Sequence, residues 1–213
     1  SGGGKTTLCN LVPRFFDVSE GEILVDGVDV RNVAQHDLRE RIGYVPQKGY
    51  LFSGTIESNL RYAKEDASEE ELREAAQTAQ AMEFIEGKPK GFQTEIAQGG
   101  TNVSGGQRQR LSIARALVKK PEIFIFDDTF SALDFKTDAS LRKALGELCE
   151  QTKCTVLLVA QRISSIMHAD RIVVLDQGAI VGIGTHEELM DSCDVYREIA
   201  FSQLSKEELG HEQ

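Results

Sequence analysis

The clearest pattern in the chain is a series of short, uninterrupted apolar runs that each lead into polar side chains. Runs of this length are typical of strands buried on both faces of a parallel sheet. The runs cover residues 42–45, 123–126 and 155–160, and the polar groups after them are Gln47, the pair Asp127 and Asp128, and Gln161. Ligands bind beyond the carboxyl ends of strands in open α/β sheets, so this edge predicts a functional site.

Apolar residues at helical spacing occupy most of the intervals between these runs. We expect helices over 6–16, 29–40 and 135–150, a last helix after Thr185, a strand over 22–27, and a hairpin made of 171–176 and 179–182. The polar end of the chain, 205–213, is expected to fray. Strands that alternate with helices in this way predict an α/β fold with a mainly parallel sheet.

A mainly helical insertion is expected between residues 48 and 120. Ser68 and Glu71 form a capping box, and apolar residues follow it at helical spacing. Ser104 and Gln107 form a second capping box, which predicts the start of another long helix.

Net charge and cysteine spacing argue against several classes of protein. The 213 residues carry a net charge of −10, which disfavours broad binding to nucleic acids or anionic membranes. No apolar run approaches the ~20 residues needed to span a bilayer, and no signal peptide is recognisable. The four cysteines are scattered and complete no metal site with histidine, so we expect reduced thiols. The four histidines are isolated from one another, which predicts solvated or structural roles.

The chain opens with the second half of a phosphate-binding loop of the form GxxxxGK[ST]. Its residues are Ser1, Gly2, Gly3, Gly4, Lys5, Thr6 and Thr7. Glycines let backbone N–H groups turn toward phosphate oxygens, and the helix that follows adds its positive end. Lys5 is placed to reach the β- and γ-phosphates of ATP. A flexible glycine terminus is the alternative. Since the motif is half complete at Ser1 and no initiator methionine is present, we expect the front of the protein to be missing.

Oxygen-bearing side chains suited to Mg²⁺ are Thr6, Gln47 and Asp127. Gln47 could instead orient a water, and taken alone it is also typical of an ordinary surface residue. Gly105 and Gly106 are unfavourable in the first turn of a helix unless something approaches the backbone closely. A second phosphate that arrives from outside would account for them.

In this order and spacing, the motifs resemble the nucleotide-binding domain of ATP-binding cassette (ABC) transporters over nearly the whole chain. The segment Ser104, Gly105, Gly106 and Gln107 is similar to the family's signature motif, which is more specific than a phosphate loop alone. By the same resemblance, Gln47 belongs to the Gln loop, Asp127 is the metal-binding Walker B acid, and Asp134 closes the D-loop.

The resemblance implies one ATP- and Mg²⁺-binding domain over residues 1–213. Its P-loop NTPase (RecA-like) core would consist of 1–47 and 121–213, and residues 48–120 would form a helical subdomain that carries the signature motif. Leu51–Leu60 and Thr94–Ile96 look like segments of ABC exporters that meet the coupling helices of the membrane domain. The implied partners are therefore a transmembrane domain, missing here, and a second nucleotide-binding domain in a head-to-tail dimer. The implied location is the cytoplasmic face of the cell membrane.

Two positions depart from the family pattern. Asp128 stands where the family has the glutamate that polarises the attacking water, and Gln161 stands where it has a histidine that contacts the γ-phosphate. An aspartate reaches about 1.3–1.5 Å less far, and general-base assistance is worth ~10²–10⁴-fold. The combination of Asp128 and Gln161 resembles that found in the degenerate-site subunit of heterodimeric exporters. This resemblance implies slow hydrolysis at this site and a signature motif that completes the partner's site.

Alternatives remain at this stage. Asp128 could be a working base, and the chain could be a non-hydrolysing module that dimerises when ATP binds. A soluble ABC ATPase of DNA repair or translation would need a coiled-coil insertion or a tandem cassette, and the sequence has neither. The transported substrate and the partner subunit do not follow from these residues.

Overall fold

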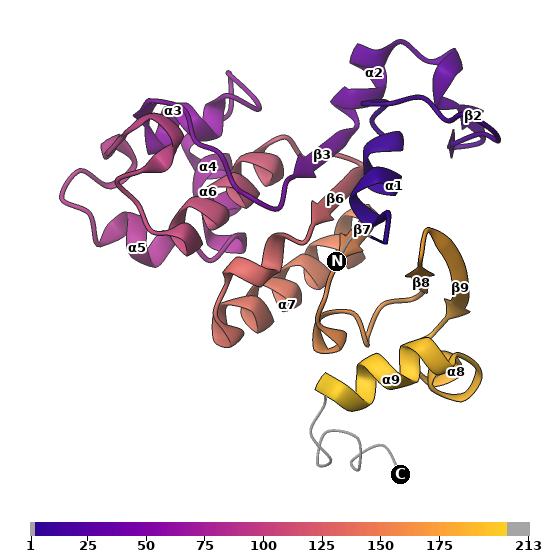
Figure 1. The fold of residues 1–213 in the computed structure, drawn as a ribbon. Helices are drawn as coiled ribbons and strands as arrows, with labels where there is room; N and C mark the ends of the chain where they lie inside the picture. The colour runs from indigo at the N-terminus through magenta and orange to yellow at the C-terminus, as the bar shows by residue number, and fades with distance from the viewer. Residues whose placement is uncertain (1–2, 204–213) are drawn as a thin grey trace.

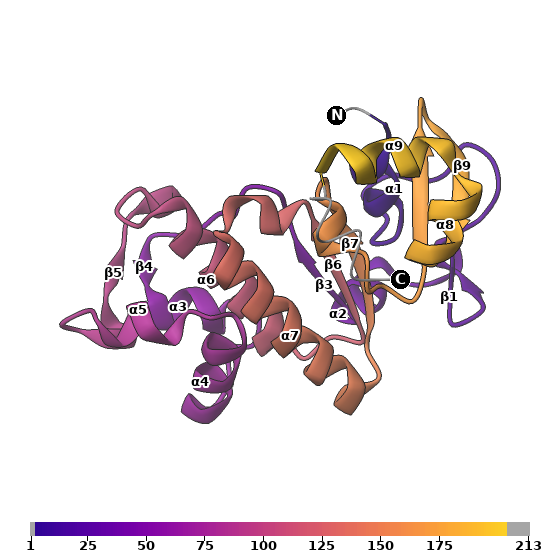
Figure 2. The ribbon, with the colours of Figure 1, turned by 90° about the horizontal axis from the view of Figure 1, so that it is seen from below.

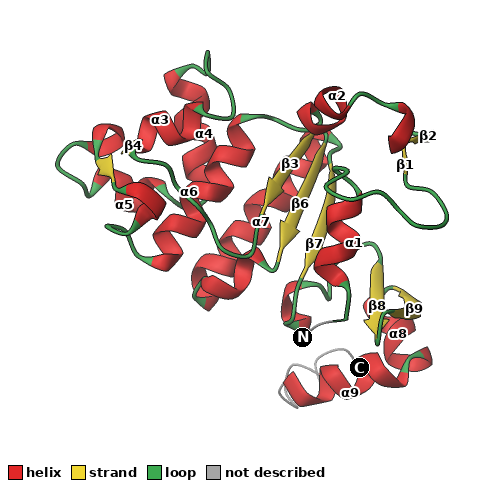
Figure 3. Cartoon of the chain, turned by 45° about the horizontal axis from the view of Figure 1, so that its top comes forward, coloured by secondary structure: helices red, strands yellow, loops and turns green. Residues whose placement is uncertain are grey.

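The centre of the fold is a parallel sheet of three strands. The computed structural model describes residues 3–203, and its strands β3 (Ile42–Val45), β6 (Ile123–Asp127) and β7 (Thr155–Val159) lie in the order β3-β6-β7. Both pairings are parallel, with Val45 opposite Phe126 and Asp127 opposite Val159. The carboxyl ends of all three strands therefore meet at one edge, as the apolar runs predicted (Figure 3).

The alternation of side chains along β6 assigns its two faces to two helices. Phe124 and Phe126 belong to the core cluster that includes Leu141 of helix α7 (Phe135–Thr152), whereas Ile125 packs in the cluster that contains Cys9 of helix α1 (Lys5–Leu11). The sheet accordingly lies between α7 and α1 (Figure 2). Since alternate residues share a face, Asp127 follows Ile125 onto the side of α1.

The residues between β3 and β6 form the helical end of the molecule, seen to the left of the sheet in Figure 1. Its elements are β4 (Gly54–Thr55), α3 (Ile56–Arg61), α4 (Glu69–Thr78), α5 (Met82–Glu86), β5 (Glu95–Ile96) and α6 (Gly105–Val118). Both predicted capping boxes are formed, by Ser68 with Glu71 and by Ser104 with Gln107. Strand β4 pairs antiparallel with β5.

The remaining strands are antiparallel. The predicted hairpin consists of β8 (Ile172–Asp176) and β9 (Ala179–Gly184), and it packs with α8 (His186–Ser192) and α9 (Asp194–Gln203) around a separate core. His186 is buried there and its ring contacts the Tyr196 hydroxyl at 2.8 Å, a structural role of the kind expected.

The segment after α1 differs from its prediction. The strand expected over 22–27 is only the pair β1 (Leu24–Val25), which forms a hairpin with β2 (Val28–Asp29). The helix expected over 29–40 divides into a 3-10 turn and α2 (Gln35–Glu40) because Val33 is extended, with φ −112° and ψ 141°. That 3-10 turn is Val30–Asn32, and further 3-10 turns lie at Gly91–Gln93, Gln98–Gly100, Thr129–Ala132 and Ile163–Ser165.

Helix α1 ends at Leu11, five residues before the predicted end. Ser1, Gly2, His211 and the tail expected to fray lie outside the described residues. Among residues 3–203, none of the helices combines the length and the apolar character that a bilayer crossing requires.

Candidate nucleotide site

A cavity of about 270 Å³ opens at the carboxyl edge of the parallel sheet. Its lining residues are Gly3, Gly4, Lys5, Thr6, Thr7, Gln47, Asp127, Asp128, Val159 and Gln161. The described part of the predicted phosphate loop and the polar groups after all three strands therefore meet in one place. Only Val159 of this set was absent from the predicted site residues.

The metal-binding candidates are adjacent. Asp127 is buried at the end of β6, and its Oδ1 accepts a hydrogen bond of 2.9 Å from the Thr6 hydroxyl at the start of α1. The Tyr44 hydroxyl lies 3.4 Å from the other carboxylate oxygen and donates to Asn10 at 2.9 Å. Burial and the neighbouring Asp127 carboxylate raise the pKa of Tyr44 to about 12, so Tyr44 stays a neutral donor beside this acid.

Asp128 occupies a turn of its own. Its backbone is left-handed, with φ 48° and ψ 32°, and its N–H donates to Val159 O at 3.0 Å, which joins the ends of β6 and β7. The buried carboxylate accepts two side-chain hydrogen bonds at one oxygen, Oδ2: Gln47 donates at 3.0 Å and Gln161 at 2.6 Å. Three strand ends thus hold one carboxylate in place.

The glycine loop has the geometry of an anion cradle. Gly4 is the N-cap of α1 in a left-handed conformation, with φ 86°, and a Cβ built there would meet no atom within 4 Å. Because glycine has no side chain, it cannot cap the first N–H groups of α1, and the residues at this helix start line the cavity. Lys5 adds a positive charge at the same position.

These residues fit a Mg²⁺–ATP complex. The Thr6 hydroxyl and the Asp127 carboxylate are hard oxygen donors within hydrogen-bond distance of each other, and Gln47 is the third candidate in the same cavity. In the described part of the chain, no group of three or more His, Cys, Asp or Glu could hold a metal ion. Mg²⁺ beside nucleotides usually binds phosphate oxygens in addition to one or two protein ligands.

The signature candidates lie apart from this cavity. Ser104 and Gln107 cap each other at the start of α6, and neither they nor Gly105 and Gly106 are among the described lining residues. A Cβ built on Gly105 would meet no atom within 4 Å, so the start of α6 is open to an incoming group. Asp134 also lies outside the cavity, as the N-cap of α7.

Comparison with known proteins decides the family. A family model described as ABC transporter matches residues 1–131, more than half of the chain. The chain belongs to the ABC transporter family. It is 47% identical over 213 residues to an uncharacterized ABC transporter ATP-binding protein of Mycobacterium tuberculosis, an alignment that covers 99% of this chain and 36% of that protein. It is 49% identical over 190 residues to an ATP-dependent lipid A-core flippase of Desulfotalea psychrophila, covering 89% of this chain and 33% of the flippase.

The fold agrees with that of a solved ABC exporter. The structure of a bacterial Atm1-family ABC exporter with ATP bound matches with a TM-score of 0.92 and 39% identity, over 97% of this chain and 36% of the exporter chain. The present chain therefore spans about a third of the length of the ABC proteins it matches.

Two groups that brace the candidate site are not among the predicted residues. The first is Gln203 at the end of α9, whose amide accepts from Ile163 N at 2.9 Å and donates to Gln161 O at 2.8 Å. These two hydrogen bonds fix the backbone on which Gln161 lies. No spacing or motif in the sequence marks a glutamine about 40 residues away as its neighbour.

The second group is the buried carboxylate of Asp138 in the first turn of α7. It receives Arg142 Nε at 3.0 Å, lies 4.0 Å from Arg162 Nη1, and is 3.5 Å from the Ser165 hydroxyl. Arg142 also donates to Ser164 O at 2.8 Å. Asp138 therefore ties helix α7 to the segment that follows Gln161.

Proposed function

We propose that the chain is the ATP-binding and ATP-hydrolysing domain of an ABC exporter, in which nucleotide binding and hydrolysis drive export of a substrate across a membrane. The cavity supports this function because it brings together an anion cradle, Lys5, and the oxygen pair of Thr6 and Asp127. Relatives whose names describe a flippase and an exporter support transport rather than a soluble role.

We further infer that hydrolysis at this site is slow. The single observation that carries this proposal is that both Gln47 and Gln161 donate to the same oxygen of Asp128. The two amide donors occupy the Asp128 oxygen that would otherwise accept a hydrogen bond from an attacking water, and Gln161 cannot take on the proton-linked charge of a histidine. Asp128, Gln161 and Gln47 are therefore the residues on which the reaction rate at this site depends.

The positions of the candidate motifs support the proposed partners. Ser104 to Gln107 and Asp134 lie outside the chain's own cavity, which supports a head-to-tail dimer in which they complete the site of a second nucleotide-binding domain. Slow hydrolysis here favours a partner of different sequence. Tyr50, Phe52 and Tyr62 are exposed around the Leu51–Leu60 segment and would meet the transmembrane domain at the cytoplasmic face of the membrane.

The test uses the full-length protein and replaces both departing residues. Asp128→Glu with Gln161→His should raise phosphate release by about 10²-fold or more, the usual contribution of general acid–base groups, with little change in ATP affinity. Lys5→Ala is the matched control, which should lose ATP binding itself. Family-typical hydrolysis by the unmodified homodimer would show that the slow-site proposal is wrong.

A second candidate is an ATP-gated dimerisation module that does not hydrolyse ATP at all. The same two hydrogen bonds to Asp128 favour it. Single-turnover measurement with labelled ATP separates the two, because a pure clamp holds ATP without releasing phosphate, whereas a slow site releases one equivalent over time.

A further inference from the structure

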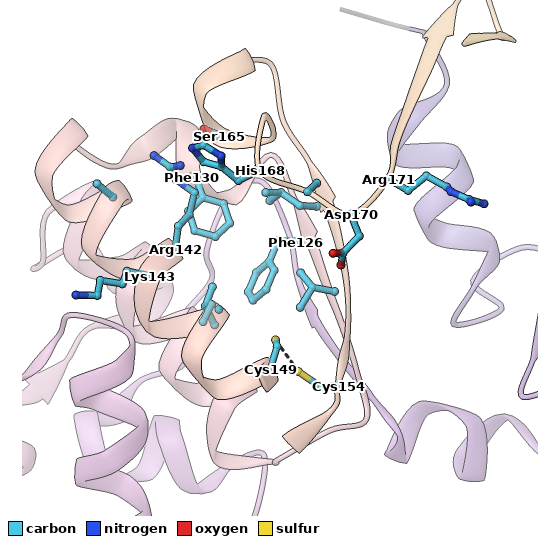
Figure 4. Close-up of a pocket in the computed structure, with 16 residues that line it drawn as sticks. Phe126, Phe130, Arg142, Lys143, Cys149, Cys154, Ser165, His168, Asp170 and Arg171 are labelled. Atoms are coloured by element: carbon cyan, nitrogen blue, oxygen red, sulfur yellow. Dashed lines mark hydrogen bonds between the residues drawn. The ribbon is translucent and has the colours of Figure 1, made fainter. Parts of the chain in front are cut away.

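Two thiols face each other on the far side of the sheet from α1. Cys149 lies in the last turns of α7, and Cys154 lies directly before β7. Their sulfur atoms are 2.7 Å apart, both cysteines are free, and both are partly exposed (Figure 4). A disulfide bond is about 2.05 Å long, so these sulfurs are within a small displacement of bonding distance.

The backbone holds the two thiols in this position. Lys153 adopts a left-handed conformation, with φ 58°, and its N–H donates to Cys149 O at 2.8 Å, which ends α7 in a tight turn. Thr155 N donates to Glu122 O at 2.9 Å and fixes the start of β7 beside β6. The thiols are therefore held together by the fold, and the entropy cost of bringing them together has already been met.

The pair opens on a cavity that can admit a small molecule. The cavity has a volume of about 680 Å³, and both cysteines line it together with apolar side chains such as Phe126, Leu145 and Leu158. In Figure 4 the two sulfurs lie at one end of this space. Cys9 and Cys193, in contrast, are buried elsewhere in the fold and do not line it.

We propose that Cys149 and Cys154 are a redox modification site, at which a low-molecular-weight disulfide such as oxidised glutathione converts the two thiols into an intramolecular disulfide. In the first step the thiolate of one cysteine attacks the small disulfide, forms a mixed disulfide and releases one small thiol. In the second step the thiolate of the other cysteine attacks the protein sulfur of the mixed disulfide and releases the second small thiol. Two protein thiols are oxidised and one small disulfide is reduced.

The surroundings of Cys149 make the reaction depend on pH. Burial, together with the neighbouring Cys154 thiol, raises the pKa of the Cys149 thiol to about 12. Since only a thiolate attacks, the step that needs the Cys149 thiolate accelerates as the pH rises. The product would join the end of α7, which is capped at its start by Asp134, to the start of β7, which leads to Gln161.

The experiment treats the full-length protein with oxidised glutathione, blocks remaining thiols by alkylation, and maps the peptides by mass spectrometry. We expect the peptide that contains residues 149–154 to lose two hydrogen atoms and to regain them with dithiothreitol, while Cys9 and Cys193 remain free thiols. Cys149→Ser should stop at the mixed disulfide on Cys154, and Cys9→Ser is the matched control that should still close the bond.

Two results would overturn the proposal. One is a wild-type peptide in which both thiols remain free after treatment at pH 7 and at pH 9. The other is a mixed disulfide that persists on Cys149 or Cys154 of the wild type. If the serine variants fail to fold, the wild-type peptide map still decides the outcome, because it needs no substitution.

Discussion

Replacing Asp138 by alanine tests whether the buried carboxylate braces the segment behind Gln161. The variant removes the acceptor of Arg142 Nε at 3.0 Å and the charge 4.0 Å from Arg162. It leaves both arginines in place, and it changes no residue that lines the nucleotide cavity. The expected result is easier opening of residues 162–167 and of the first turns of α7.

The size of the effect follows from burial. Removing one partner of a buried ion pair costs about 3–5 kcal/mol. The Asp138 side chain is 1% exposed, but Arg142 is 26% and Arg162 34% exposed, so both arginines can turn to water once the carboxylate is gone. The cost should therefore fall at the lower end, about 3 kcal/mol. Since each 1.36 kcal/mol is a factor of ten, this corresponds to roughly 10²-fold faster exchange of amides released by local opening.

Hydrogen exchange of the full-length protein, read by mass spectrometry of peptides, measures this opening. The amides of Ser165 and Met167 are informative because they donate to Arg162 O and Ile163 O within the braced segment. Glu147→Ala is the control, an exposed carboxylate on the same helix. The bracing role is refuted if the exchange of these amides differs between the Asp138 and Glu147 variants by less than about threefold, within the usual scatter of such effects.

Further predictions concern packing and pH. Gly43→Ala should destabilise the protein by about 1–3 kcal/mol in urea unfolding, because the new Cβ would lie 2.7 Å from the ring of Pro121. Gly146→Ala should stabilise the protein by about 0.5–1 kcal/mol, since that position lies within α7 with no atom within 4 Å of the new Cβ. If both variants were less stable than the wild type, the opposite effects predicted for the two glycines would be wrong. The ion pair with Lys64 and the Ser68 N–H lower the pKa of Glu71 from 4.5 to about 2. A carboxyl group whose pKa is lowered in the folded state stabilises the protein above its unfolded pKa, and this stability is lost as the pH falls. The free energies of unfolding of the wild type and Glu71→Gln should therefore differ above pH 4.5 and converge toward pH 2; a difference that stays constant over this range would refute the prediction.

The parallel sheet and the site edge could be predicted because they depend on local patterns. Buried strands read as unbroken apolar runs, and the alternation along β6 decides that Asp127 faces α1 and Thr6. The two capping boxes were equally readable, since a cap involves residues only three positions apart.

What could not be predicted depends on contacts between distant segments. Asp138 appears in the sequence as one more acid on a helix, and only the fold shows that Arg162 and Ser165 approach it. The prediction of one helix over 29–40 is wrong for a local reason. The Asp29 side chain accepts from Arg31 N and starts a turn there, an alternative to the helix that aspartate often provides.

The order of strands in the sheet also has a consequence for how the chain folds. Strand β6 pairs with β7 across roughly 30 residues, but with β3 across roughly 80, because the helical insertion lies between them. The entropy of closing a loop grows only with the logarithm of its length, so the longer closure costs about 0.8 kcal/mol more. We therefore expect β6, α7 and β7 to form first during folding, with β3 joining late. A small penalty of this size explains how an α/β core can tolerate a large helical insertion between two paired strands.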